Sequence, residues 1–89
     1  MDFEYSLYKS ESNKQKHGIS FEEAKILWLV DNIIIPAITR GEKRYMIIAE
    51  TNGLYFSCIF TTRNGKIRII SCRRSREKER RLYDEKIKA

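Results

Sequence analysis

The chain has 89 residues, of which 42% are hydrophobic and 34% are charged, and its formal net charge at pH 7 is +6. This length supports one small hydrophobic core and excludes a second, so we expect a single domain over residues 1–89. The N-terminal sequence lacks the features of a signal peptide, and no apolar run approaches the roughly 20 residues that span a bilayer. We therefore expect a cytoplasmic protein that makes no membrane contact.

The residues that most often bind transition metals are scarce in this sequence. There are two cysteines, Cys58 and Cys72, and one histidine, His17, and neither cysteine belongs to a CxxC motif. A zinc site needs about four such ligands. We expect no metal site and no cofactor.

The N-terminal residues predict a short strand followed by a capped helix. Residues 2–5 can form a strand, and Ser6 is a favourable N-cap for a helix that continues to about Lys16. Gly18 suits the left-handed conformation at which many helices end. The first helix is therefore expected between these two residues.

A second helix and an edge strand are expected next. Ser20 and Glu23 have the spacing of a capping box, which predicts a helix over residues 21 to about 29. The β-branched segment 30–36 contains the sole proline, which favours a short edge strand or an extended crossing. Residues 39–43 are expected to form a turn.

Two Asn-Gly dipeptides, at 52–53 and 64–65, are the most informative local feature. This dipeptide strongly favours two-residue type I′ hairpins, so residues 43–74 are predicted to form a three-stranded antiparallel meander. Simple alternation then gives the register, which pairs Tyr45 with Phe60, Ile47 with Cys58, Ala49 with Phe56, Thr61 with Arg68, Ile59 with Ile70, and Ser57 with Cys72.

This register sorts the strand residues onto two faces. The more apolar face is expected to be the core, covered by the two N-terminal helices; it holds Tyr45, Ile47, Ala49, Leu54, Phe56, Cys58, Phe60, Ile67 and Ile69. The other face is mixed; it holds Arg44, Met46, Ile48, Glu50, Tyr55, Ser57, Ile59, Thr61, Arg68, Ile70, Cys72 and Arg74. The two cysteines are thus expected on opposite faces of the sheet, so they should not form a disulfide.

A third helix is predicted from Ser75, as N-cap, to about Lys86. It is strongly charged and its few apolar residues are Leu82, Tyr83 and Ile87, so either it packs lightly or a partner covers it. Together these elements predict an α+β fold in which an antiparallel sheet carries two N-terminal helices on one face and a charged helix at the C-terminus.

The positive charge of the chain is concentrated in one segment. Residues 63–81 hold nine of the 18 Lys and Arg residues but only two of the 12 Asp and Glu residues, a local net charge of +7. A single basic patch of this kind is typical of proteins that bind a polyanion, RNA or DNA first among them.

Two segments of the sequence resemble those of a known protein family. KHGISFEEA at 16–24 and RIISCRR at 68–74 resemble the BrnT toxins of bacterial type II toxin-antitoxin systems, and the resemblance covers nearly the whole chain. It implies a RelE-like fold and a metal-independent endoribonuclease that arrests growth. It also implies neutralisation by a BrnA-like antitoxin with a ribbon-helix-helix DNA-binding part, in a heterotetramer.

RNA cleavage without a metal requires a base for the 2′-hydroxyl, positive charge at the phosphate and an acid for the 5′-oxygen, and it leaves a 2′,3′-cyclic phosphate. Arg68, held rigidly by a strand, is our first catalytic candidate, although an ordinary solvated arginine is the alternative. His17 suits proton transfer at neutral pH but can equally cap the first helix. Of Arg73 and Arg74, one can bind phosphate while the other braces the turn, and we assign Arg74 to catalysis. Tyr83 can donate a proton or simply pack the last helix.

Further residues are assigned to binding. Those expected to contact RNA are Lys16, Arg44, Arg73, Arg76 and Arg80. An apolar belt of Met46, Ile59 and Ile70 is where an antitoxin could dock. The alternative to a ribonuclease is a non-catalytic module that binds nucleic acid or an acidic partner, since binding needs charge but no positioned proton donor.

Overall fold

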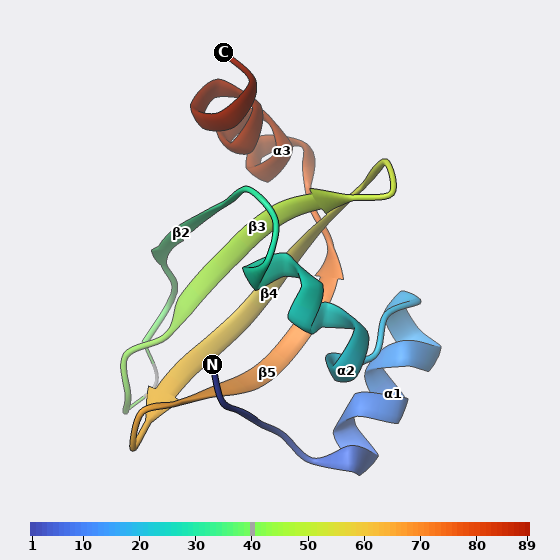
Figure 1. Ribbon diagram of the computed structural model, residues 1–89, viewed down its shortest axis with the longest axis vertical. Helices are drawn as coiled ribbons and strands as arrows, with labels where there is room; N and C mark the ends of the chain where they lie inside the picture. Colours follow the sequence, from blue (N-terminus) through green and yellow to red (C-terminus); the bar gives the residue numbers. More distant parts are fainter. Residues whose placement is uncertain (40) are drawn as a thin grey trace.

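The computed structural model describes residues 1–39 and 41–89 and shows an α+β fold built on one five-stranded sheet (Figure 1). The strand order is β1-β5-β4-β3-β2; β1 runs parallel to β5, and the other neighbours are antiparallel. The strands are β1 (Phe3–Glu4), β2 (Asn32–Pro36), β3 (Tyr45–Thr51), β4 (Leu54–Arg63) and β5 (Lys66–Arg74). The helices are α1 (Leu7–His17), α2 (Phe21–Ala24) with the 3-10 turn η1 (Lys25–Trp28), and α3 (Glu77–Tyr83) with the π-helical turn η2 (Asp84–Lys88).

The predicted capping residues and edge strand are present in the structure. Ser6 and Gly18 bound α1, with Gly18 at φ +79°, and Ser20 and Glu23 form the capping box of α2. β2 lies at the edge of the described sheet and pairs with β3. The turn expected over residues 39–43 includes Arg40, which lies outside the described residues.

Both predicted hairpins are confirmed. Asn52 and Asn64 have φ values of 52° and 50°, and Gly53 and Gly65 have 78° and 77°, as a type I′ turn requires at its two central positions. The register of β3 on β4 is also the predicted one, including Tyr45 opposite Phe60 and Ala49 opposite Phe56.

The predicted register of β4 on β5 is correct near the turn and wrong beyond it. Phe60 lies opposite Ile69, but Ile59 lies opposite Ser71, so Ile70 is an extra residue on β5. Such a β-bulge reverses the alternation of every residue that follows it. Cys72 and Arg74 therefore lie on the helix-covered face, and Ser71 and Arg73 lie on the other face.

The predicted separation of the two cysteines is wrong for this reason. Cys58 and Cys72 are direct neighbours across β4 and β5, both are fully buried, and both are free thiols.

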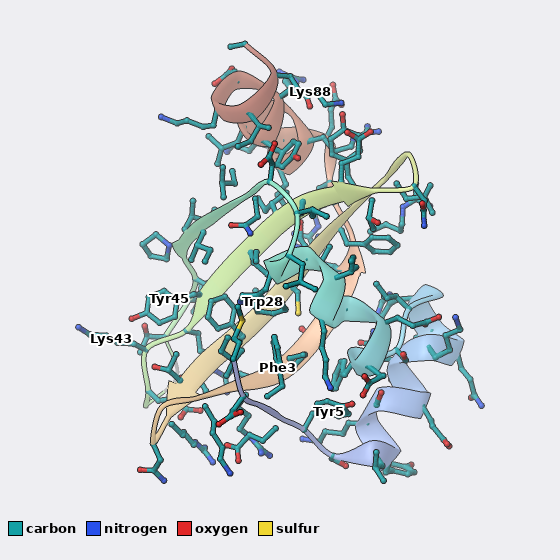
Figure 2. The ribbon with its side chains drawn as sticks, in the orientation of Figure 1. Phe3, Tyr5, Trp28, Lys43, Tyr45 and Lys88 are labelled. Atoms are coloured by element: carbon teal, nitrogen blue, oxygen red, sulfur yellow. The ribbon has the colours of Figure 1, made fainter. Side chains whose placement is uncertain are left out.

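The N-terminal helices cover one face of the sheet, as predicted. Figure 1 shows α2 and η1 crossing this face, with α1 beside β5. Trp28, at the end of η1, stacks edge to face with Phe3 and with Phe60, at centroid distances of 5.1 and 5.2 Å, and Tyr45 lies next to this cluster (Figure 2). The fully buried residues Phe21, Leu27 and Ile47 complete the core on this side.

Asn13 fastens α1 to the outer edge of β5. Its side-chain amide donates to the carbonyls of Ile19 (2.7 Å) and Cys72 (2.8 Å), and its oxygen accepts the Cys72 N–H (3.2 Å). The side chain therefore takes the place of a neighbouring strand at this part of β5, which β1 is too short to reach.

The last helix packs against one end of the opposite face. Tyr83 meets Tyr55 edge to face at 5.7 Å, and Lys88 pairs with Glu50 at 2.7 Å. The predicted start of this helix is wrong, because Arg76 is the N-cap and the Ser75 hydroxyl lies 2.7 Å from that of Ser57. The part of this face that α3 leaves uncovered is the open face of the sheet.

No helix among the residues described here is both long and apolar enough to span a bilayer.

Candidate functional site

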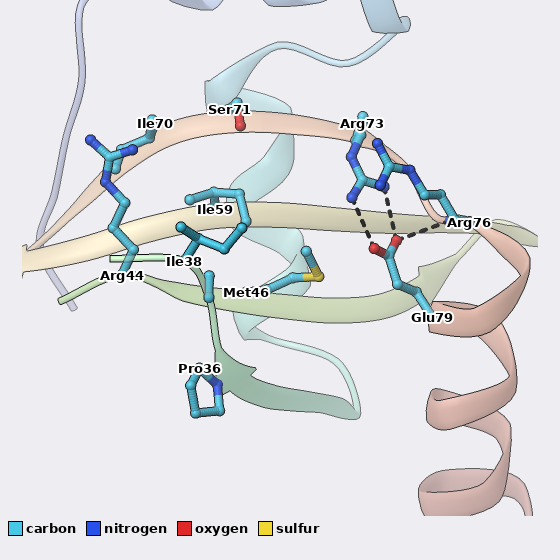
Figure 3. A pocket seen from close by; sticks show the side chains of 11 residues that line it. Pro36, Ile38, Arg44, Met46, Ile59, Ile70, Ser71, Arg73, Arg76 and Glu79 are labelled. Carbon is cyan, nitrogen blue, oxygen red and sulfur yellow. Dashed lines mark hydrogen bonds and ion pairs between the residues drawn. The ribbon is translucent and has the colours of Figure 1, made fainter. Parts of the chain in front are cut away.

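A pocket of about 460 Å³ lies on the open face of the sheet, and we call it the open-face pocket (Figure 3). Its floor is apolar and comes from β3, β4 and β5, while Pro36, Ala37 and Ile38 border it beside β2. Its remaining lining residues are Arg44, Met46, Ile59, Ile70, Ser71, Arg73, Arg76 and Glu79. A concave site of this size, with apolar walls and a few converging polar groups, is typical of ligand-binding sites.

Among the described residues that line the pocket, the charged ones are three arginines and one glutamate, a net charge of +2. Figure 3 shows Arg44 at one end, reaching across β4 towards Ile70, and Arg73, Arg76 and Glu79 at the other. The Nε of Arg44 is buried and has no hydrogen-bond partner among the described atoms. Arg44 also forms no ion pair with a carboxylate among the described residues, so its guanidinium group has capacity to bind an anion at the pocket.

Arg73 and Glu79 form a fixed pair at the second end of the pocket. Both Nη atoms of Arg73 donate to the Glu79 carboxylate at 2.8 Å, and the same carboxylate accepts from the Ser57 hydroxyl (2.8 Å) and the Arg76 N–H (3.0 Å). The hydrogen bonds from Arg73 are the main cause that lowers the pKa of Glu79 to about 2. Glu79 is thus ionised at neutral pH and neutralises much of the charge of Arg73.

The β-bulge is what gives the pocket this composition. With the extra residue, Ile70 and Ser71 both line the pocket, and Arg73 follows on the same face. Bulges next to functional sites commonly redirect side chains in this way.

Six of the residues predicted from the sequence line the open-face pocket. Three were assigned to RNA, and they are Arg44, Arg73 and Arg76; three were assigned to an antitoxin, and they are Met46, Ile59 and Ile70. The structure therefore brings both predicted groups together in one place.

Arg68 lies on the open face but outside this lining. It is opposite Thr61, as predicted, and its guanidinium is 3.9 Å from Glu4 of the neighbouring β1. Its side chain is 33% exposed. The Thr61 hydroxyl is turned away from it and donates to the Lys43 carbonyl at 2.7 Å.

Arg74 and the end of α1 lie on the other side of the sheet. The guanidinium of Arg74 is 5.9 Å from the centre of the Phe56 ring on the helix-covered face. Lys16 and His17 are exposed in the last turn of α1, and the adjacent Gly18 borders a separate shallow pocket together with Phe56. Neither His17 nor Arg74 is brought into the open-face pocket.

Tyr83 is buried in the packing of α3. Only 3% of it is exposed, its hydroxyl donates to the Asp31 carbonyl at 3.1 Å, and burial raises its pKa. Arg80 is exposed on the same helix and borders a small pocket with Tyr55 and Asp84. Tyr83 and Arg80 therefore lie away from the open-face pocket.

The sequence analysis assigned no role to Glu79, the residue with the most hydrogen bonds in the pocket. One signal was available, because Glu79 is one of only two acidic residues in the basic segment 63–81. Asn13 was given no role either, and nothing in its local sequence indicates a bond to Cys72, which lies 59 residues away. Within the described ranges, no group of three or more His, Cys, Asp or Glu side chains is arranged to hold a metal ion.

These features define a small α+β domain with a basic pocket on the open face of its sheet, and the charge of this pocket suits an anionic ligand. Residues 5–79 match the family of the ribonuclease toxin, BrnT, of type II toxin-antitoxin systems. Since this match spans most of the 89 residues, the chain belongs to the BrnT family. Membership implies a ribonuclease toxin with an RNA substrate and a protein antitoxin. No curated protein matches the chain in sequence.

Proposed function

We propose that this chain is a single-domain, RelE-like endoribonuclease that cleaves cytoplasmic RNA without a metal ion. We also propose that a BrnA-like antitoxin with a ribbon-helix-helix part neutralises it in a heterotetramer. The observation that carries the proposal is the family match over residues 5–79. The basic open-face pocket supports it, because it offers guanidinium groups where a phosphate would approach the sheet.

The proposed reaction is transfer of the phosphate within the RNA strand. The 2′-oxygen loses its proton to a base and attacks the phosphorus, and the bond to the 5′-oxygen breaks as that oxygen gains a proton. The products are a 2′,3′-cyclic phosphate and a 5′-hydroxyl. Arginines suit this reaction because their fixed forks stabilise the charge that develops on the phosphate oxygens.

Among the four catalytic candidates, Arg68 keeps the strongest support, because it shares the open face with the pocket. His17 is the candidate for proton transfer, since it is exposed and is the sole histidine. It would act only if the RNA passes around the outer edge of β5 to the end of α1. For Arg74 and Tyr83 the contacts with Phe56 and Asp31 favour packing roles.

A second candidate function is a non-catalytic module that binds RNA or an acidic partner. The specific observation in its favour is that the four catalytic candidates do not gather in one site, whereas the binding candidates Arg44, Arg73 and Arg76 do. Such a module needs positive charge but no positioned acid or base.

An RNA cleavage assay in EDTA, with the new 3′ ends analysed, tests the proposal. We expect the native protein to leave 2′,3′-cyclic phosphates, and Arg68→Ala to lose the activity while it remains folded. Arg63→Ala is the matched control, because Arg63 is a half-exposed strand arginine that also pairs with a glutamate, Glu42. Binding without cleavage would favour the non-catalytic module. Equal cleavage by native protein and Arg68→Ala would place the site elsewhere.

We propose further that the antitoxin inhibits by covering the apolar belt of Met46, Ile59 and Ile70, which is the floor of the same pocket. A charge buried without a partner is costly, so Met46→Asp or Ile59→Asp should weaken the complex by at least tenfold. If both variants bound the antitoxin with native affinity, the docking site would lie elsewhere.

A further inference from the structure

We infer that the open-face pocket holds one unpaired nucleotide of single-stranded RNA, with the base on the apolar floor and the flanking phosphates on Arg44 and Arg76. This inference rests on the proposed function, because it names the form of RNA that the site accepts. It also assigns a binding role to the pocket whether or not the pocket contains the catalytic groups.

The floor of the pocket suits a base. Met46, Ile59 and Ile70 come from three neighbouring strands, and each is only half-buried, so together they leave an apolar surface uncovered. The flat face of a base is the least polar part of a nucleotide and would cover this surface. The pocket volume of about 460 Å³ is enough for one such unit.

The two ends of the pocket suit phosphate. Neither Arg44 nor Arg76 forms an ion pair with a carboxylate among the described residues. Arg73 is different, because Glu79 already occupies both of its Nη atoms at 2.8 Å. Arg44 and Arg76 are therefore the arginines with capacity to bind a new anion, and the apolar floor lies between them (Figure 3).

The requirement for an unpaired nucleotide follows from the shape of RNA. In a duplex the bases are stacked and paired inside the helix, so none can lie flat on a protein surface. In a single strand a base can turn out of the stack and leave its neighbouring phosphates on either side. Two separated positive groups with an apolar surface between them match this arrangement.

The two methionines of the chain provide a direct test by ¹³C-methyl NMR of the full-length protein. Met46 is on the pocket floor, whereas Met1 is 74% exposed at the N-terminus and serves as an internal control. The probes are a single-stranded 2′-O-methyl RNA, which cannot be cleaved, the duplex of the same sequence, and ribose 5-phosphate. We expect the Met46 methyl signal alone to shift, and only with the single strand.

A variant pair links the signal to the phosphate site. Arg44→Gln should weaken the binding of the single strand by about tenfold, since it removes a charged hydrogen-bond donor. Arg63→Gln, which alters an arginine outside the pocket, should change it less than twofold.

Several outcomes would overturn the inference. An equal Met46 shift with ribose 5-phosphate would mean that no base occupies the floor, and an equal shift with the duplex would mean that pairing does not matter. A Met46 signal that responds to the antitoxin but to none of the RNA probes would make the pocket a protein-docking site only. If the protein cleaved RNA but the Met46 methyl signal did not shift with the single strand, the inference would be refuted and the proposed function would stand. If the Met46 signal shifted but the protein did not cleave RNA, the proposed function would be refuted and the binding role of the pocket would stand.

Discussion

Cys58 and Cys72 face each other across β4 and β5 on the helix-covered side of the sheet. The backbone N–H and carbonyl of Cys72 are both bonded to Asn13 at the outer edge of β5, so they point away from β4. The two cysteines therefore form a non-hydrogen-bonded cross-strand pair, the kind in which side chains approach most closely. They meet because the bulge at Ile70 shifts the register by one residue.

These thiols should be unreactive in the folded protein. Both cysteines are fully buried and so shielded from reagents, and burial also raises the pKa of the Cys58 thiol well above its ordinary value, so little Cys58 thiolate is present to react. We expect iodoacetamide to modify the native protein at least ~100-fold more slowly than the protein in 6 M guanidinium chloride, as judged by mass spectrometry. Rapid modification of either cysteine under native conditions would contradict the observed burial.

Glu79 should make the stability of the protein depend on pH in the acid range. Its folded-state pKa of about 2 lies below the ordinary 4.5, so the stabilisation is complete above about pH 5 and is lost as the pH falls towards 2. Urea unfolding should show that Glu79→Gln lowers the free energy of unfolding by roughly 2–3 kcal/mol at pH 7. This difference from the native protein should shrink steadily between pH 5 and pH 2.

The matched control for this experiment is Glu77→Gln. Glu77 is one turn before Arg81 and pairs with it at 2.7 Å, but both side chains are about 70% exposed. Exposed pairs contribute little, so this variant should change the free energy of unfolding by less than about 0.5 kcal/mol at any pH. Equal effects of the two substitutions would show that the ion pair between Arg73 and Glu79 contributes no more to stability than an exposed ion pair does.

Asn13 should be essential for the attachment of α1 to the sheet. Asn13→Asp keeps the oxygen that accepts the Cys72 N–H but loses the two donors to the Ile19 and Cys72 carbonyls. We expect a loss of about 2–4 kcal/mol in the free energy of unfolding at pH 7, measured by urea titration, because a buried charge then faces two carbonyls. Ser12→Asp, at the preceding and only half-buried position of α1, serves as the control. A stability equal to that of the native protein would rule out this role.

Arg76 and Arg80 should differ in their contribution to RNA binding, although both belong to the same basic segment. Arg76 lines the open-face pocket, whereas Arg80 lies one turn further along α3 and away from it. Arg76→Ala should weaken binding of single-stranded RNA by about tenfold. It should also lower the number of counterions released on binding, measured from the salt dependence of the affinity, by about one. Arg80→Ala should have a clearly smaller effect, and equal losses in fluorescence titrations would indicate a diffuse electrostatic surface instead.

Much of the fold could be predicted from the sequence, because it depends on local chemistry. The two Asn-Gly turns specified both hairpins and the register of β3 on β4, and the caps at Ser6 and Ser20 specified where α1 and α2 begin. Where a feature requires a left-handed residue or a reciprocal hydrogen bond, few residue types can supply it. The concentration of positive charge over residues 63–81 was equally visible in the sequence.

The tertiary structure alone decided which arginine enters the pocket. Alternation along β5 assigned Arg74 to the open face, but the bulge at Ile70 brings Arg73 there and turns Arg74 towards Phe56. The contacts that accompany this bulge come from distant segments, the Asn13 side chain at the edge of β5 and Glu79 of α3 bonded to Arg73, and no local sequence signal encodes them. The sequence by itself determined the elements, their turns and the basic patch, whereas the composition of the pocket depended on contacts between residues far apart in the chain.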